Sequence, residues 1–318
     1  MKKLIIIVLV LATVSLGGLL WWINGTSPVN PANKESAIFV IQKGSGLKEI
    51  ALRLEAAGLI RDRIIFFLYA RFGRFEGKIQ AGDFRLNPSM SVEEIAQNLT
   101  HGTLDVWITI PEGERGTEIA DTLKEKIPTF DPSWTIILTQ NEGFLFPDTY
   151  LIPKDASINS IIIQMKNNFE QKYQSLDTSK TKLSKSEIVT LASLVEREAK
   201  FAEDRPLVAS VLLNRFQIGM KLDIDATVQY ALGYSTEEKT WWRKNLTFED
   251  LKITSPYNTY RNAGLPPTPI ANPGIEALRA VVNPADTNFL YYISDKTGHL
   301  HFAKTLNEQS ANIKKFGL

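Results

Sequence analysis

The sequence is organised around Ser184-Lys185-Ser186-Glu187-Ile188-Val189-Thr190-Leu191-Ala192-Ser193-Leu194-Val195-Glu196-Arg197-Glu198-Ala199. Ser184 followed by Glu187 three residues later is a capping box, which predicts that a helix starts here. Apolar residues then recur at helical spacing, namely Ile188, Leu191, Ala192, Val195 and Ala199. Such spacing indicates a helix with one buried face.

Two glutamates, Glu196 and Glu198, lie near the end of this predicted helix. At about 100° per residue they fall on opposite edges of the apolar face, with Glu198 between Leu191 and Leu194. A carboxyl group walled by leucines loses hydration, which disfavours its charged form and raises its pKa. Because a general acid must hold its proton near neutral pH, Glu198 is predicted to be the better proton donor. The alternative is that both glutamates are ordinary solvated charges at a helix edge.

Length and composition narrow the function classes. The 318 residues allow two or three domains with ample core. A net charge of +1 gives no electrostatic case for a nucleic-acid partner. The absence of cysteine excludes disulfides, a lipoprotein anchor and thiolate metal sites.

The N-terminus predicts a membrane anchor. Residues 4–23 are uncharged and mostly apolar, long enough as a helix to cross a hydrocarbon core of roughly 30 Å. Lysines at 2 and 3 predict that residues 1–3 form the cytoplasmic end of the chain. Trp21 and Trp22 are suited to the opposite membrane–water interface. A cleaved signal peptide is the alternative, although its apolar core would be unusually long. We therefore expect a single-pass protein of the inner (cytoplasmic) membrane, with all later residues on its outer, periplasmic side.

Residues 24–37 are rich in Asn, Pro and Ser and are interpreted as a tether. The string Glu-Ile-Ala-x-x-Leu follows three times, at 49–54, 94–99 and 118–123, and predicts short amphipathic helices. A β-prone run precedes each copy, at 38–41, 83–86 and 106–110. Residues 38–105 resemble a LysM-like module, which implies a small glycan-binding subdomain. The fold class expected for the whole chain is therefore α+β, with a larger mixed α/β catalytic domain at 106–318.

Within residues 106–318, the stretch 142–150 combines Gly, Pro and aromatic residues and predicts a packed turn or a cleft wall. Helices are expected at 157–173 and 204–220. Asn214, near the end of the second of these, is either a substrate contact or an ordinary helix-end residue.

Several residues are candidates for binding a sugar. Asp225, Thr227 and Gln229 alternate, so they would share one face if this piece of chain is extended. The loops at 255–260 and 264–274 are rich in Pro, Tyr and Asn. Aromatic rings suit the C–H face of a sugar and amides suit its hydroxyl and acetamido groups. The candidates in the first loop are Tyr257, Asn258 and Tyr260, and the alternative is a stiff loop that only packs.

These motifs occur in a fixed order along the chain. They are Leu-Ala-Ser-Leu-Val-Glu-Arg-Glu-Ala at 191–199, Asp-Arg at 204–205, Val-Ala-Ser-Val at 208–211, Asn-Arg at 214–215, Gly-Met-Lys-Leu at 219–222, Asp-Ala-Thr-Val at 225–228, the loop 255–260, Gly-Leu-Pro-Pro at 264–267 and Asn-Pro-Gly at 272–274. Together they resemble the YceG-like family of membrane-bound endolytic murein transglycosylases. The resemblance implies that the second glutamate of the Glu-x-Glu pair, Glu198, is catalytic.

The sequence departs from this family at two places. Asp225-Ala226-Thr227 stands where Asp-Pro-Thr is frequent, and Glu308-Gln309-Ser310 stands where Glu-His-Asn is common. The second departure puts in doubt a catalytic role for a histidine there. His299 and His301 would share a strand face as half a metal site, but no motif completes it, so no metal and no cofactor are expected.

The resemblance implies cleavage of the β-1,4 bond between N-acetylmuramic acid and N-acetylglucosamine inside a peptidoglycan strand, leaving a 1,6-anhydro end. The expected partners are glycan strands, with a peptidoglycan synthase as a further candidate and a role in ending strand elongation. Glu196 and Glu198 cannot act as two carboxylates across one bond, because side chains two apart on a helix do not face each other. Two rivals stay open: a hydrolase that uses Asp225 or Glu142 as second carboxylate, and a non-catalytic glycan-binding scaffold.

Overall fold

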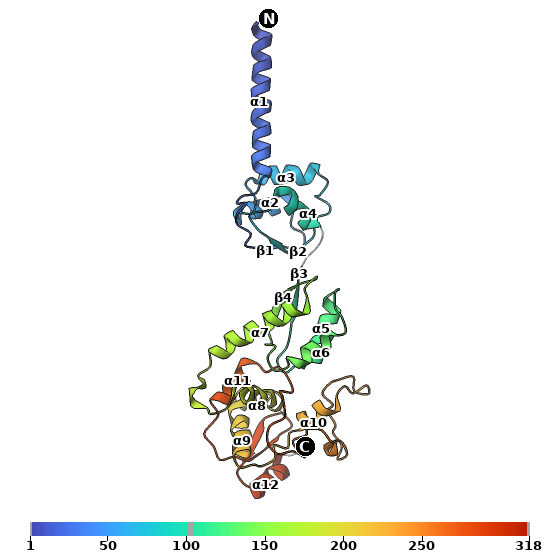
Figure 1. Cartoon of the computed structure of the whole chain (residues 1–318), viewed down its shortest axis with the longest axis vertical. Helices are drawn as coiled ribbons and strands as arrows, with labels where there is room; N and C mark the ends of the chain where they lie inside the picture. Colours follow the sequence, from blue (N-terminus) through green and yellow to red (C-terminus); the bar gives the residue numbers. More distant parts are fainter. Residues whose placement is uncertain (1, 101–104, 317–318) are drawn as a thin grey trace. The chain divides into compact units, whose positions relative to one another are not determined.

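The computed structural model of the chain describes residues 2–100 and 105–316, with the backbone alone at 2–8 and 10. The chain separates into two compact units, one of Met1–Val106 with Leu151–Asp155 and one of Trp107–Tyr150 with Ala156–Leu318 (Figure 1). Helices predominate and the strands form small two-stranded sheets, which confirms a mixed helix and strand architecture.

The first unit contains four helices and two paired strands among its described residues. In order they are α1 (Lys2–Thr26), β1 (Ala37–Ile41), α2 (Leu47–Ala56), α3 (Arg63–Phe72), β2 (Gly82–Leu86) and α4 (Val92–Thr100). The two strands are antiparallel, with Phe39 opposite Phe84. Alternate residues of each strand point inward, as expected for a sheet with one buried face.

The first two copies of Glu-Ile-Ala-x-x-Leu lie in α2 and α4, as predicted. Their Ile, Ala and Leu side chains are buried in one apolar cluster with Phe39 and Phe84. Helix α3 was not predicted, because its apolar residues run almost without interruption and show no helical period.

The end of α1 is fastened to the first unit. Gly25 packs so closely on Ile65 that a β-carbon there would displace the Ile65 side chain, and the Trp21 indole donates a 3.1 Å hydrogen bond to Asp62, the N-cap of α3. In the segment after α1, the Arg61 guanidinium donates to the carbonyl of Pro28 at 2.7 Å. The region interpreted as a tether is thus held against the unit.

Among the residues that the structure describes, no helix is both long enough and apolar enough to pass through a membrane. The span expected at 4–23 lies partly outside the described side chains.

The second unit is built around one buried helix. Its elements are β3 (Asp105–Thr109, which begins in the first unit), α5 (Gly116–Lys126), α6 (Trp134–Gln140), β4 (Thr149–Pro153, which ends in the first unit), α7 (Ile158–Gln174), η1 (Thr178–Lys180), α8 (Lys185–Glu198), α9 (Arg205–Gln217), α10 (Asp225–Leu232), η2 (Asp250–Lys252), α11 (Ile275–Val282), β5 (Tyr291–Ser294), β6 (Leu300–Ala303) and α12 (Leu306–Phe316). β3 pairs with β4, and β5 pairs antiparallel with β6.

Helix α8 begins where the capping box predicts. Ser184 accepts a hydrogen bond from the Glu187 amide, and the Glu187 carboxylate accepts from the Ser184 amide at 2.7 Å. Residues 188–195 are all buried, and α8 packs against α9, α10 and α11 (Figure 1). The C-terminal end of α8 extends beyond these buried residues, so the packed helix fixes the position of its last residue, Glu198.

The stretch 142–150 is the packed turn that its composition predicts. Gly143 has φ of +89° and packs against Pro269, so both its backbone conformation and its surroundings require glycine. The buried Asn272 side chain accepts from the amides of Gly143 and Leu145 at 2.8 and 3.1 Å and donates to the Glu114 carbonyl at 2.9 Å. One side chain thereby joins three segments that are distant in sequence.

Candidate active site

A cavity of about 360 Å³ opens at the C-terminal end of α8, where Glu198 is the last helical residue. It is lined by Arg197, Glu198, Arg215, Leu222, Asp223, Asp225, Ala226, Gln229, Tyr260 and Tyr292. Charged and phenolic side chains dominate this lining, so the cavity is suited to a polar ligand.

Among the residues that line this cavity, Glu198 carries a carboxyl group with a strongly raised pKa. Burial raises the pKa of Glu198 to about 7, the negative charge of Asp225 adds to this rise, and a hydrogen bond from Tyr292 opposes it. That hydrogen bond runs from the Tyr292 hydroxyl to Oε2 of Glu198 and is 2.9 Å long. The predicted direction of the pKa shift is therefore confirmed.

The surroundings of Glu198 differ from those predicted. Leu191 and Leu194 are core residues and do not line the cavity. The side chains that line it beside Glu198 include Tyr260 and Tyr292. Tertiary contacts thus add tyrosines to the surroundings of Glu198 that the helical period alone did not predict.

Tyr292 is itself held in place. It lies in β5 opposite Phe302 of β6, and its backbone carbonyl accepts a 2.9 Å hydrogen bond from the Gln309 side chain of α12. Burial, followed by the charge of Glu198, raises the pKa of the Tyr292 hydroxyl well above its usual range. The hydroxyl therefore keeps its proton and acts as a fixed donor to Glu198.

Asp225 lines the same cavity as Glu198, and its negative charge contributes to the raised pKa of Glu198. It is the first residue of α10, and its Oδ1 accepts a 2.6 Å hydrogen bond from the Tyr260 hydroxyl. Burial and this bond raise the pKa of Tyr260, so the phenol remains protonated and orients the carboxylate. A fixed negative charge thus stands in the same cavity as the protonatable Glu198.

Arg215 forms part of the cavity wall. Its Nε donates to the Leu290 carbonyl at 2.6 Å and its Nη1 donates to the Leu222 carbonyl at 2.8 Å. These bonds tie the chain before β5 to the chain before α10, so the guanidinium fixes the cavity and contributes positive charge to it.

Glu196 has a different environment from Glu198. It forms a 2.8 Å ion pair with Arg205 and accepts a 3.0 Å hydrogen bond from the Gly274 amide, and it does not line the cavity. Burial raises its pKa, while the Gly274 amide and Arg205 oppose that rise. Glu196 therefore has a structural role, which separates the two glutamates as the sequence analysis expected.

The candidate residues at 225–229 lie on a helix, and the expectation of an extended segment was wrong. In α10, Asp225 and Gln229 are four residues apart and both line the cavity. Thr227 is fully buried, and its hydroxyl donates to the Ile224 carbonyl at 2.6 Å. Thr227 is therefore a structural residue in the first turn of α10 and does not share a face with Asp225 and Gln229.

Two predicted amide contacts serve the fold. The Asn214 amide donates to the carbonyls of Thr287 and Phe289 at 2.9 and 3.0 Å. Asn258 is fully buried and donates to the carbonyls of Leu251 and Ile253, both at 2.9 Å. Neither residue lines the cavity around Glu198.

Tyr257 lies in a second cavity, of about 580 Å³, while Tyr260 of the same loop lies in the first. The Tyr257 ring packs on Tyr230 at 4.7 Å between centroids, and the Tyr257 hydroxyl is 2.7 Å from that of Thr268.

Glu142 lines this second cavity, where burial raises its pKa to about 7 and its Oε2 accepts a hydrogen bond from the Gly116 amide at 2.6 Å. Glu142 and Glu198 thus line different cavities.

The two histidines near the C-terminus have aromatic and acidic neighbours. His301 lies 2.9 Å from Asp295 and stacks on Phe316, and His299 stacks on Phe201. Within the described part of the chain, no cluster of three potential metal ligands occurs.

Sequence reasoning singled out Arg215 with Asn214 but missed Tyr292 and Gln309 as parts of this site. Gln309 lies in the triplet Glu308-Gln309-Ser310, where the departure from the family pattern was noted, so its position offered a signal. Tyr292 offered none, because a tyrosine in a short strand is ordinary.

A buried carboxyl group that can both hold and release its proton near neutral pH, placed in a polar cavity with a second carboxylate, indicates an enzyme that uses general acid–base chemistry. Comparison with known proteins then gives the family. The model of the YceG-like family matches residues 39–315, and the chain belongs to this family.

Two relatives of known name and one solved structure are similar to this chain over most of its length. An endolytic murein transglycosylase of Bacillus subtilis (strain 168) is 33% identical, over 93% of this chain and 89% of that protein. One of Streptococcus pneumoniae serotype 2 is 30% identical, over 95% of this chain and 63% of that protein. The crystal structure of a yceG-like protein from Listeria monocytogenes matches with a TM-score of 0.56 and 31% identity, covering 87% of this chain and 99% of that one.

Proposed function

We propose that this chain is an endolytic murein transglycosylase. It cuts the β-1,4 bond between N-acetylmuramic acid and N-acetylglucosamine inside a glycan strand and leaves a 1,6-anhydro end. Two relatives carry that name and are 33% and 30% identical over nearly the whole chain. The observation that carries the proposal is the position of Glu198, which lines the polar cavity at the end of α8 and accepts a hydrogen bond from Tyr292. Its pKa of about 7 in that place lets it give and accept a proton near neutral pH.

The reaction needs a single proton shuttle. Protonated Glu198 donates its proton to the glycosidic oxygen as the bond from C1 of the muramic acid to that oxygen breaks. The resulting carboxylate accepts the proton of the 6-hydroxyl on the same muramic acid, and that oxygen bonds to C1. Glu198 ends protonated again, no water is consumed, and the intramolecular nucleophile is favoured entropically.

Asp225 supports the charge that develops during this step. The transition state of glycosidic cleavage resembles an oxocarbenium ion, which is positive at C1. A fixed negative charge in the same cavity stabilises that positive charge, provided that the carboxylate is held in place. The Tyr260 hydroxyl holds it through the 2.6 Å hydrogen bond.

A hydrolase that uses Asp225 to activate water is the second candidate, and the shared cavity of Asp225 and Glu198 is the observation that favours it. Glu142 is a poorer second carboxylate because it lines the other cavity. Mass spectrometry of the products from purified glycan strands decides between the two. Anhydro ends, lighter by one water than hydrolytic ends, support the transglycosylase, and reducing ends support the hydrolase.

We further propose that residues 38–105 form a LysM-like glycan-binding subdomain. The antiparallel pair β1–β2 with α2 and α3 between its strands in sequence supports this assignment. Replacing exposed residues of this unit should weaken co-sedimentation with insoluble peptidoglycan. Unchanged co-sedimentation across a set of such variants would rule the assignment out.

Finally, we propose that residues 4–23 anchor the chain in the cytoplasmic membrane, with residues 1–3 on the inner side and the enzyme on the outer side. On that side, a peptidoglycan synthase is a candidate partner, and termination of glycan strands is a candidate role. The uninterrupted helix Lys2–Thr26, roughly 37 Å long at 1.5 Å per residue, supports the anchor. Extraction by alkaline carbonate would contradict it.

A further inference from the structure

Helix α3 carries an apolar stripe that the first unit leaves uncovered. Ile64, Leu68 and Phe72 are four residues apart and lie on one side of the helix. Phe72 is 77% exposed, Ile64 is 53% exposed and Leu68 is half-buried, whereas Phe66 and Ala70 on the opposite side are fully buried. We call Ile64, Leu68 and Phe72 the outer stripe of α3.

The outer stripe lies beside the base of α1. The residues that follow its first two members, Ile65 and Tyr69, are the ones that meet α1: Ile65 packs on Gly25, and the Tyr69 ring is 6.3 Å from the Trp22 ring. Figure 1 shows α3 crossing the unit at the end where α1 enters it. The exposed apolar surface of α1 is therefore continued by the outer stripe of α3.

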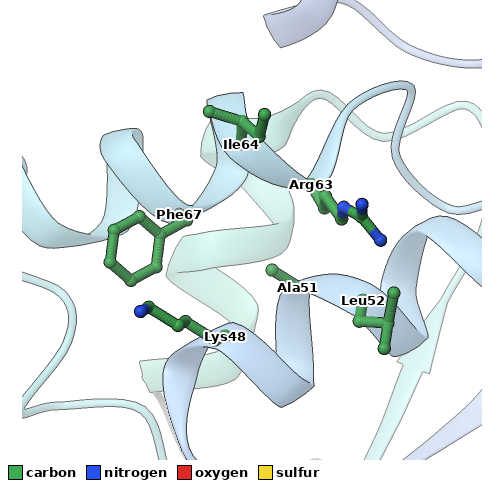
Figure 2. Close-up of a pocket in the computed structure, with 6 residues that line it drawn as sticks. All are labelled: Lys48, Ala51, Leu52, Arg63, Ile64 and Phe67. Atoms are coloured by element: carbon green, nitrogen blue, oxygen red, sulfur yellow. The ribbon is translucent and has the colours of Figure 1, made fainter.

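On its other side, the outer stripe borders a groove between α2 and α3 (Figure 2). The groove measures about 320 Å³ and is lined by Ala51, Leu52, Ile64 and Phe67, with Lys48 and Arg63 at its rim. In Figure 2, Phe67 of α3 points toward Lys48 of α2. Apolar walls with cationic rims suit an acyl chain that ends in an anionic headgroup.

The charge around α3 is basic. Five lysines or arginines and two acidic residues lie between Arg61 and Lys78. The ion pairs of Arg63 with Glu55 and of Arg71 with Glu76 are long, at 3.8 and 4.0 Å, and both arginine side chains are more than half exposed. These cations are therefore available to lipid phosphates.

We propose that α3 lies in the headgroup layer of an anionic membrane, with Ile64 and Phe72 inserted among the lipids and Arg63 and Arg71 bound to phosphates. This inference rests on the proposed anchor, because α1 brings α3 to the membrane surface. Trp21 fits the arrangement, since its indole is at an interfacial position and is hydrogen-bonded to the N-cap of α3.

The absence of cysteine in the sequence allows a direct test with the full chain. Three single-cysteine variants are labelled with an environment-sensitive fluorophore and reconstituted into vesicles that carry nitroxide-labelled lipids. Phe72→Cys reports on the outer stripe, Leu16→Cys reports on α1, and Ile38→Cys is the matched control. Ile38 is 48% exposed and lies on β1. Figure 1 shows β1 at the end of the unit away from α1.

In vesicles containing phosphatidylglycerol, we expect headgroup-level nitroxide to quench the Phe72→Cys probe at least about twofold more than the Ile38→Cys probe. In purely zwitterionic vesicles the quenching at Phe72→Cys should weaken, while that at Leu16→Cys stays the same. Equal quenching at Phe72→Cys and Ile38→Cys, with strong quenching at Leu16→Cys, would overturn the α3 proposal alone. Absence of quenching at Leu16→Cys by acyl-chain nitroxides, carried in a second set of vesicles, would overturn the anchor as well. A blue-shifted Phe72→Cys probe without lipid quenching would assign the stripe to a second copy of the chain and would also overturn the proposal.

Discussion

The Tyr292 hydroxyl donates a 2.9 Å hydrogen bond to Oε2 of Glu198. This bond stabilises the ionised carboxyl, whereas burial and the charge of Asp225 stabilise the protonated one. The balance leaves the pKa of Glu198 at about 7, so both protonation states are accessible near neutral pH. A group that must first give and then accept a proton requires this balance.

Glu198→Gln and Glu196→Gln form a matched pair on one helix. Glu198→Gln should reduce strand cleavage by at least about 10²-fold, because the amide cannot donate the proton. Glu196→Gln should keep most activity per folded molecule but lower the free energy of unfolding by up to about 3 kcal/mol, because Arg205 loses its buried 2.8 Å partner and keeps only the 3.5 Å pair with Glu112. Anhydro-end assays and urea denaturation of both variants measure the two effects. Full cleavage by Glu198→Gln would refute its assignment as the acid.

Tyr292→Phe removes the hydrogen bond that favours the Glu198 carboxylate. The pKa of Glu198 should then rise, and the falling limb of the pH–activity profile, expected near pH 7 for the parent chain, should move to higher pH. The ring is retained, so packing in the cavity is preserved. The profile of kcat against pH measures the shift, and an unmoved limb would show that Tyr292 only packs.

Asp225→Asn should move the same limb in the opposite direction. Removing the negative charge lowers the pKa of Glu198, because one cause of its rise is lost. The maximal rate should also fall by about 10-fold or more, since the oxocarbenium-like transition state loses a stabilising charge. If Asp225→Asn instead changed the products from hydrolytic to anhydro ends, the hydrolase reading of the wild-type chain would be correct.

Glu198 also makes stability depend on pH. Below its ordinary pKa of 4.5 the carboxyl is protonated in the folded and unfolded chains alike and contributes no difference. Between pH 4.5 and about 7 only the unfolded chain ionises, so the folded state loses stability as pH rises, up to about 3 kcal/mol in total at 1.36 kcal/mol per pKa unit. Glu198→Gln should therefore match the parent chain at pH 4 and exceed its stability at pH 8. Urea denaturation at both pH values measures this, and equal stability at pH 8 would contradict the raised pKa.

Local signals predicted the helix that carries the acid. The capping box at Ser184 and Glu187 fixes where α8 begins, because both of its hydrogen bonds lie within one turn. The apolar period then identifies its buried face, and the position of Glu198 follows from the same arithmetic. The strands at β1 and β2 were predicted for a similar reason, since β-prone runs are bounded by turn residues.

The predictions that were wrong concern residues whose roles depend on tertiary contacts. Thr227 and Asn258 look polar in sequence but are fully buried, with hydrogen bonds to backbone carbonyls, and no local pattern reports those partners. Tyr292 reaches Glu198 from 94 residues further along the chain. Such a pairing depends on how β5 and β6 pack in the unit, which propensity and periodicity do not encode.

The Asn272 side chain, which joins Gly143, Leu145 and Glu114, also has a chemical consequence. Spontaneous deamidation of an asparagine begins when the backbone nitrogen of the next residue attacks the side-chain carbonyl. The next residue here is Pro273, whose nitrogen carries no hydrogen and cannot close the succinimide ring. Asn272 is thereby protected from deamidation to aspartate. An aspartate there would place an unpaired negative charge in a buried position where the Asn272 amide now donates to the Glu114 carbonyl.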